Sequence, residues 1–393
     1  VDPVKPDDCN KSLVTINITD ASASEEGVAT MYFTVTGADG ELITEFDSTQ
    51  KSTWMDDLQF SIMFLAPALE GESYNKWTQY LYTKVEVQDE GEWPNPVGTF
   101  AYFGDREDVA DFPENFTTDG AGNYSYTFDV DLTSIMLDVD GDPILGDDGE
   151  PIESSYVPFD RSLLHRVGVF TGGHEGPTGA GVYDFVPDGN EPMETRDIVQ
   201  TEACQTCHGE NEFHGHGGDR LSVQDCNFCH SNDYRSPYND EFVTMPVMIH
   251  KIHAGGSLAT IPGADGIVWD DPGTEEDESA DNGSYKIYRL RGYVRTYEWW
   301  NVDFPAVIEN CTKCHTGDGA DVDNWKNVPS RTVCGSCHDN LDWTETDNTS
   351  AAYHTGGAQA TDNSCLGCHG TIAKSVEEAH DFIAKDPRAT PEY

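Results

Sequence analysis

The sequence has few basic residues and no long apolar run. Its 393 residues include 22 Lys and Arg against 72 Asp and Glu, which gives a formal net charge of −50. Such a chain lacks the basic face that nucleic-acid phosphates require, and it is equally unsuited to an anionic lipid surface. No apolar run approaches the roughly 18 residues of a membrane span. We therefore expect no nucleic-acid partner and no membrane-spanning helix.

The N-terminus shows no secretory signal peptide, and we interpret Val1 as a mature N-terminus left by the processing of an exported protein. Cys9 lies between acidic and amide residues and lacks the apolar stretch expected before a lipid-modified cysteine. A free thiol and an intermolecular disulfide are both open for Cys9. We expect a feature of the chain end without a redox role.

The other ten of the eleven cysteines form five C-x-x-C pairs, and a histidine follows each pair directly. The five motifs are Cys204/Cys207/His208, Cys226/Cys229/His230, Cys311/Cys314/His315, Cys334/Cys337/His338 and Cys365/Cys368/His369. Two thiols at this spacing can each form a thioether to a haem, and the adjacent imidazole can bind the iron as its proximal ligand. The sequence therefore predicts five covalently bound c-type haems.

Zinc and thiol redox chemistry are the alternatives for these motifs. A zinc ribbon also uses paired C-x-x-C units, but it does not need a histidine directly after each pair. A redox C-x-x-C is usually single and lies near a βαβ pattern. The fivefold recurrence of the histidine favours haem.

The first half of the chain carries strand signals and no haem motif. Apolar and β-branched segments at 28–35, 60–64, 124–130 and 166–170 are separated by turn-forming residues. This pattern predicts an all-β domain over residues 1–192, built as an antiparallel sandwich or a small barrel with Greek-key connections. Residues 193–393 form the second predicted domain, a pentahaem unit of short helices and coil in which the haems supply much of the apolar interior. The close motif pairs at 204/226 and 311/334 suggest a duplicated two-haem unit plus one extra haem.

Eight histidines remain outside the motifs, enough to give every iron a second, distal imidazole. His250 and His253 lie three residues apart on a short predicted helix, which Pro246 suits as an opening residue and Gly255-Gly256 can end, so both imidazoles are on one side of it. His380 follows a capping-box pattern at Ser375 and Glu378. His354 precedes two glycines that allow close approach of the backbone to a haem.

His214 and His216 stand two residues apart, so an extended segment would point them in opposite directions. We expect one of them to ligate and choose His214, which completes the distal set of His214, His250, His253, His354 and His380. His165 and His174 belong to the β half and are expected to be ordinary surface histidines. A role for His165, His174 or His216 as a ligand across a domain or subunit boundary stays open.

The haem half resembles the OmcA/MtrC family of outer-membrane multihaem cytochromes. The resemblance is carried by residues 196–199, 204–210, 213–215, 248–255, 310–315, 324–326, 329–331 and 334–339. It implies a split β-barrel followed by one pentahaem domain, with distal ligands at His214, His250, His253, His354 and His380. Typical members have two such units and ten haems, whereas this sequence carries one unit and five motifs.

The resemblance implies extracellular electron transfer by a non-catalytic carrier that is exported to the cell surface. The expected partners are other multihaem cytochromes or copies of the chain itself, with a metal oxide, an electrode or a soluble shuttle as the acceptor. A subunit of a polymeric cytochrome filament is the first alternative. A multihaem reductase is the second, although such enzymes usually show one haem with an unusual ligand.

Overall fold

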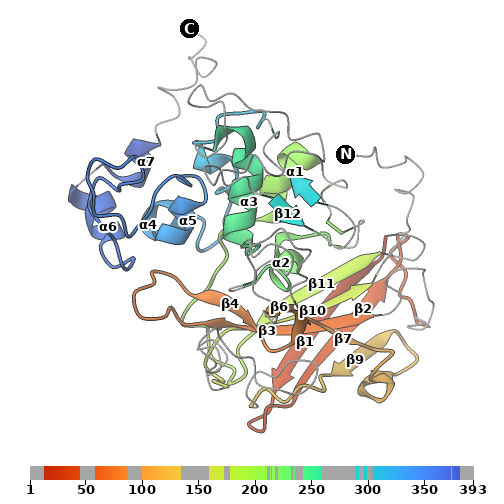
Figure 1. Cartoon of the computed structure of the whole chain (residues 1–393). Helices are drawn as coiled ribbons and strands as arrows, with labels where there is room; N and C mark the ends of the chain where they lie inside the picture. Colours follow the sequence, from red (N-terminus) through yellow and green to blue (C-terminus); the bar gives the residue numbers. More distant parts are fainter. Residues whose placement is uncertain are drawn as a thin grey trace. The chain divides into compact units, whose positions relative to one another are not determined.

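The computed structural model describes residues 13–44, 58–86, 100–133, 159–171, 178–209, 213, 215–216, 220–231, 234, 242–258, 289–291, 296–298, 302, 304–372 and 374–380. The chain divides into two compact units (Figure 1). Unit 1 comprises Val1–Pro67, Asn75–Val85 and Tyr102–Tyr234, and unit 2 comprises Ala68–Tyr74, Glu86–Ala101 and Arg235–Tyr393. Unit 1 therefore contains the strands of the β half together with the first two haem motifs. The domain boundary at 192/193 stays a prediction.

Unit 1 is built on two antiparallel sheets. The first has the order β1-β2-β9-β8, with β1 at Thr15–Ala23, β2 at Ala29–Thr36, β9 at Asn123–Thr127 and β8 at Phe116–Thr118. The second has the order β11-β10-β3-β4, with β11 at Gly179–Phe185, β10 at His165–Thr171, β3 at Gln59–Ala66 and β4 at Lys76–Gln79. The short β7 (Glu107–Asp108) pairs with β3, and β5 (Tyr82–Glu86) pairs with β6 (Phe100–Gly104).

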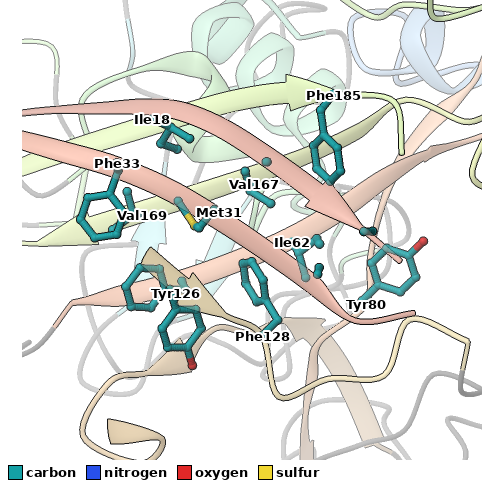
Figure 2. Packing of buried hydrophobic residues seen from close by; sticks show 14 of the residues in the cluster. Ile18, Met31, Phe33, Ile62, Tyr80, Tyr126, Phe128, Val167, Val169 and Phe185 are labelled. Carbon is teal, nitrogen blue, oxygen red and sulfur yellow. The ribbon is translucent and has the colours of Figure 1, made fainter. Parts of the chain in front are cut away.

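The main apolar core of unit 1 lies between these strands. Its buried members include Met31 and Phe33 from β2, Ile62 from β3, Tyr126 from β9 and Val167 from β10. Figure 2 shows these side chains gathered against one another. All four segments predicted as strands are strands in the structure, because their alternating apolar residues face this core. The predicted all-β fold of the first half is confirmed.

Strand β3 is buried along its whole length because both of its faces are covered. Its alternate residues Phe60, Ile62 and Phe64 face the main core. Met63 and Leu65 point to the opposite face and pack in a second, smaller apolar cluster. A sheet that is covered on both faces can support a second layer of structure, and here that layer includes a haem motif.

The remaining elements are short helical segments separated by coil, as predicted. They are α1 (Thr201–His208) and α2 (Val223–Asn227) in unit 1, and α3 (Met245–Ala254), α4 (Asn324–Asn327), α5 (Arg331–Gly335), α6 (Cys365–Gly367) and α7 (Val376–Ala379) in unit 2. Single turns lie at Pro113–Asn115, Gly255–Ser257, Cys311–Lys313 and Cys368–Ile372, and β12 (Arg289–Arg291) pairs with β13 (Thr296–Glu298). No helix in the described part of the chain is long and apolar enough to cross a membrane.

Candidate haem sites

Each of the C-x-x-C-H motifs lies in or beside a helical turn. In the second, third and fourth motifs the histidine amide donates to the carbonyl of the first cysteine at 2.9, 2.9 and 2.8 Å, and the second cysteine amide donates to the same carbonyl at 3.2 Å. The first motif lies wholly within α1, and α6 begins at the first cysteine of the fifth. Residues i, i+3 and i+4 share one face of a helical turn. This turn therefore presents two thiols and one imidazole together, as thioether attachment of a haem requires.

The second cysteines of the five motifs differ in burial. Cys207, Cys337 and Cys368 are exposed, whereas Cys229 and Cys314 are half-buried. The Sγ of Cys207 lies 3.9 Å from the hydroxyl of Thr206, and Cys314 ends the turn Cys311–Lys313 with a φ of −110°, beyond the usual α-helical range. None of the ten motif cysteines is in a disulfide. The motifs are thus alike in sequence but unlike in burial and turn geometry, and thioether attachment at all ten cysteines stays a prediction.

The second and fourth motifs are capped in the same way. Ser222 and Ser330 each lie four residues before the first cysteine, and each side chain accepts a hydrogen bond from the third amide of its helix. The carbonyl of each serine also accepts from the amide of that cysteine, at 3.2 Å for Cys226 and 3.0 Å for Cys334. Such a cap fixes the start of a helical turn. The shared cap agrees with the predicted duplication of a two-haem unit.

In unit 2, three proximal histidines each face a second histidine. The ring centres lie 6.3 Å apart for His250 and His315, 6.2 Å for His338 and His380, and 6.3 Å for His354 and His369. Two imidazoles that bind one metal ion from opposite sides, with nitrogen–metal bonds of about 2.0 Å, have ring centres about 6.3 Å apart. Each separation therefore fits an iron between a proximal and a distal imidazole.

Unit 1 contains a fourth pair of this kind. His230 of the second motif faces His216, with ring centres 6.0 Å apart and the ring planes at 25°. His216 has a backbone φ of +49°, which makes it the one non-glycine residue with positive φ in the described ranges. Backbone in this region is costly for a residue with a side chain and tends to occur where function fixes a side-chain position. His216 thus stands where a distal ligand of the second haem is needed.

Backbone hydrogen bonds fix the orientation of several of these imidazoles. The carbonyl of Val376 is 2.7 Å from Nδ1 of His380, and the carbonyl of Gly357 is 3.1 Å from Nδ1 of His354. Nδ1 of His253 lies 2.9 Å from the carbonyl of Ile249. A carbonyl can only accept, so each Nδ1 carries the proton and Nε2 keeps its lone pair for a metal. His253 is therefore prepared as a ligand in the same manner as His380 and His354.

Burial also favours the neutral, ligating form of the imidazoles in the third site. It lowers the pKa of His315 to about 4 and lowers the pKa of His250 as well. Nδ1 of each of these two histidines is buried without a hydrogen-bond partner, and so is Nε1 of Trp325. Buried polar groups normally have partners. Donors of this kind suit a haem, whose edge carries carboxylates, so the residues fit the group that the motifs predict.

Two of the motif thiols favour the neutral form. Burial raises the pKa of Cys226 to about 12 and the pKa of Cys334 to about 11. Reactive thiols and zinc ligands are instead stabilised as thiolates. Within the described ranges, no three His, Cys, Asp or Glu side chains gather as a metal-binding cluster. Haem attachment remains the interpretation that the geometry supports.

The fourth and fifth motifs are joined by a buried ion pair. Arg331 and Asp362 each precede the first cysteine of their motif by three residues, and Nε of Arg331 lies 2.8 Å from Oδ1 of Asp362. The other carboxylate oxygen of Asp362 accepts from Ser73 Oγ at 3.4 Å, and its amide donates to the carbonyl of Gly71 at 2.7 Å. Residues 68–74 of unit 2 thereby contact Asp362 and help to hold the two motifs together.

Three of the distal ligands predicted from the sequence face a proximal histidine, namely His250, His354 and His380. Nδ1 of His253 is held by the carbonyl of Ile249, and its role as a ligand stays a prediction. The predicted ligand His214 lies outside the described residues, as do His174 and Cys9. His216 was not chosen from the sequence because alternation alone does not separate it from His214. The two glycines that follow it are a signal that could have favoured it, since two glycines also follow shortly after His253 and His354.

His165 is not a surface histidine, so the expectation for it is wrong. It is fully buried in unit 1, where its Nε2 lies 2.8 Å from the hydroxyl of Tyr80 and its Nδ1 lies 2.9 Å from the carbonyl of Leu163. Rings of Phe64, Phe159 and Phe185 surround it. Both ring nitrogens are occupied, so His165 serves the core and not a haem.

Comparison with known proteins supports the same class. The family model "Outer membrane cytochrome MtrC/MtrF-like, domains II/IV" matches residues 196–381. The multiheme cytochrome MtrC of Shewanella baltica (strain OS185) is 25% identical over 280 residues, which are 68% of this chain and 31% of that protein. The crystal structure of the outer membrane decaheme cytochrome OmcA matches with a TM-score of 0.67 at 21% identity, over 96% of this chain and 49% of that one. That of MtrC from Shewanella baltica OS185 gives 0.57 at 20% identity, over 95% and 46%.

The β unit, the five motifs and the facing histidines define a multihaem c-type cytochrome. Residues 196–381 of the chain are similar to the OmcA/MtrC family of outer-membrane multihaem cytochromes, as the resemblance predicted. It spans about a third of the length of the matched curated relative and just under half of the solved structures.

Proposed function

We propose that the chain is a pentahaem electron carrier in which every iron has two imidazole ligands. The ten motif cysteines attach the haems, the exposed Cys207 and the half-buried Cys314 included. The proximal ligands are His208, His230, His315, His338 and His369. Each haem, once attached, supplies a one-electron ferric–ferrous couple. The four histidine pairs at 6.0 to 6.3 Å are the observation that carries this proposal.

The distal ligands follow from those pairs. His216 serves the second motif, His250 the third, His380 the fourth and His354 the fifth. We favour His253 over His214 as the remaining distal ligand, because its Nδ1 is bonded to a backbone carbonyl, as in His354 and His380. His214 stays an alternative ligand, and the substitutions described below decide between the two.

Two imidazoles on one iron leave no position for a substrate, which favours a carrier over a reductase. The protein residues contribute attachment, ligand orientation and burial. A net charge of −50 favours cationic or neutral contact surfaces on partners and repels anionic ones at low salt. As partners we propose other multihaem cytochromes or copies of the chain, and as acceptors a metal oxide, an electrode or a soluble shuttle, at the cell surface. Assembly into a filament stays a prediction.

Substitution of His216 tests the ligand assignment. In His216→Met one of the haems changes from bis-histidine to histidine–methionine ligation, and its reduction potential rises. Low-temperature electron paramagnetic resonance and spectropotentiometry should show one altered haem and four unaltered ones. His214→Met, two residues away, is the matched control and should leave all five unchanged. The reverse result would assign the site to His214.

A further inference from the structure

The second haem motif contains a large aromatic residue between its cysteines. Phe228 occupies the position directly before the second cysteine, where the other four motifs carry Thr206, Lys313, Ser336 and Gly367. Its side chain is 1% exposed, and it is a member of the second apolar cluster of unit 1. The other buried members are Met63, Leu65, Trp77, Leu164 and Phe170, which come from β3, β4, β10 and the residue before β10. The sheet therefore buries a residue of the motif itself.

Strand β10 is shaped to receive this ring. A Cβ placed on Gly168 would lie 2.5 Å from Cε2 of Phe228, so no larger residue fits opposite the ring. The ring of Phe170 meets that of Phe228 edge to face, with centres 5.4 Å apart at 81°. Aromatic pairs prefer this arrangement. Gly168 is thus a glycine of close approach, where any side chain would displace the motif.

The backbone of the motif is held at the same point. The side-chain amide of Gln79, at the end of β4, donates to the carbonyl of Phe228. A Cβ on Gly104, at the end of β6, would collide with that carbonyl oxygen. Phe228 is enclosed by the turn in which the amides of Cys229 and His230 both donate to the carbonyl of Cys226. Fixing Phe228 therefore fixes the backbone from which the His230 imidazole extends.

We propose that Phe228 is a positioning residue that mounts the second haem on the β sheet of unit 1. The sheet acts as a rigid base through Gly168 and Gln79, and it sets the orientation of His230 toward His216. The inference rests on the proposed haem at this motif. In this proposal the β sheet does more than cover the haem: it affects the electronic properties of one haem by orienting its ligand.

The test uses three single variants of the full holoprotein and the double variant Gly168→Ala/Phe228→Ala. Gly168→Ala and Phe228→Ala should each shift or broaden one of the five low-spin ferric resonance signals and leave four unchanged. The effect of Gly168→Ala should be smaller when Phe228→Ala is already present, because most of its steric conflict is with that ring. Phe228→Leu, which keeps an apolar side chain, should restore most of the native signal.

Gly181→Ala is the matched control. Gly181 lies on the neighbouring strand β11, and a Cβ there would lie 2.9 Å from the carbonyl oxygen of Ile16, away from the motif. This variant should lower the thermal midpoint without moving any haem signal. If Gly168→Ala behaves like Gly181→Ala while five haems per chain are retained, the inference fails and the proposed function stands. If the unsubstituted protein lacks five haems, the proposed function itself fails.

Discussion

The two units bury their interiors by different means. Unit 1 has two clusters of buried apolar side chains on the two faces of one sheet, and one of its haem motifs is anchored in the smaller cluster. In the described part of unit 2, the buried apolar side chains are Val243, Val247, Met248, Ala254 and Leu258, although this unit carries three motifs. The comparison predicts that unit 2 depends on its haems for much of its interior, whereas unit 1 has two apolar clusters of its own.

Polar contacts connect the motifs of unit 2. Arg331, Asp362 and Ser73 connect two motifs through an ion pair and hydrogen bonds. Trp343 also lies between two sites, with its indole nitrogen 3.3 Å from a Cβ placed on Gly335 of the fourth motif and its ring centre 5.3 Å from that of His354. These contacts orient the motifs relative to one another, but they bury little apolar surface. Unit 2 should therefore be the more sensitive of the two to loss of a haem.

The largest effect should come from removing a haem attachment in unit 2. In Cys334→Ala/Cys337→Ala the fourth haem is lost, and we expect residues 304–372 to become the main site of cleavage in limited proteolysis. The strands of unit 1 should resist cleavage, because their cores contain no haem. Mass spectrometry of the fragments measures both. Cys9→Ser, which lies outside the motifs, should digest like the unsubstituted protein, and equal cleavage in both units would contradict the comparison.

The converse change removes apolar core from unit 1. Phe60 is fully buried and stacks on Tyr126 with ring centres 3.8 Å apart. Phe60→Ala should lower the free energy of unfolding of unit 1 by about 4 kcal/mol, as large-to-small core substitutions do. Denaturant unfolding followed by far-ultraviolet circular dichroism measures the loss. The signals of the three haems in unit 2 should stay unchanged, and their disturbance would show that the units do not unfold separately.

Unit 1 should also show a pH effect that comes from one buried histidine. Burial lowers the pKa of His165 to about 4, below the value near 6.5 of an unfolded chain. The unfolded state therefore takes up the proton first as the pH falls. The contribution of His165 is complete above pH ~6.5 and lost progressively down to pH ~4, a change of about 3 kcal/mol. The free energy of unfolding of unit 1 should be measured between pH ~4 and ~6.5 in the unsubstituted protein and in His165→Gln. The variant should show a shallower pH dependence, and equal slopes would contradict this role of His165.

The smallest effect should come from the ion pair of unit 2. Asp362→Asn removes the charge that faces Arg331, and we expect a loss of about 2 kcal/mol, because the carboxylate is buried and the guanidinium is partly exposed. Thermal unfolding followed at the haem absorption band measures this loss. Asp347→Asn is the control, since that exposed carboxylate caps only its own turn. A loss of the same size in both variants would show that the pair does not join the motifs.

The sequence was sufficient for features that depend on local pattern. Alternating apolar residues identified β2, β3, β9 and β10, and Ser375 with Glu378 identified the start of α7 through a capping box that the structure contains. The proline near the start of α3 and the glycine at its end were read correctly as well. In each case neighbouring residues determine the structure.

Features that depend on tertiary contacts could not be predicted from the sequence. His216, which faces His230, has a backbone φ of +49° that no local sequence pattern predicts. The burial of His165 depends on the hydroxyl of Tyr80, 85 residues away. The anchoring of Phe228 depends on a gap opposite Gly168 that forms only when β10 and the second motif meet.

Quantitative electron paramagnetic resonance of the fully oxidised protein tests the central claim most directly. Five haems with an imidazole on each side should give five low-spin ferric centres per chain and no high-spin signal. A high-spin signal amounting to one centre per chain, or a total below five, would show that at least one motif does not hold its iron between two histidines.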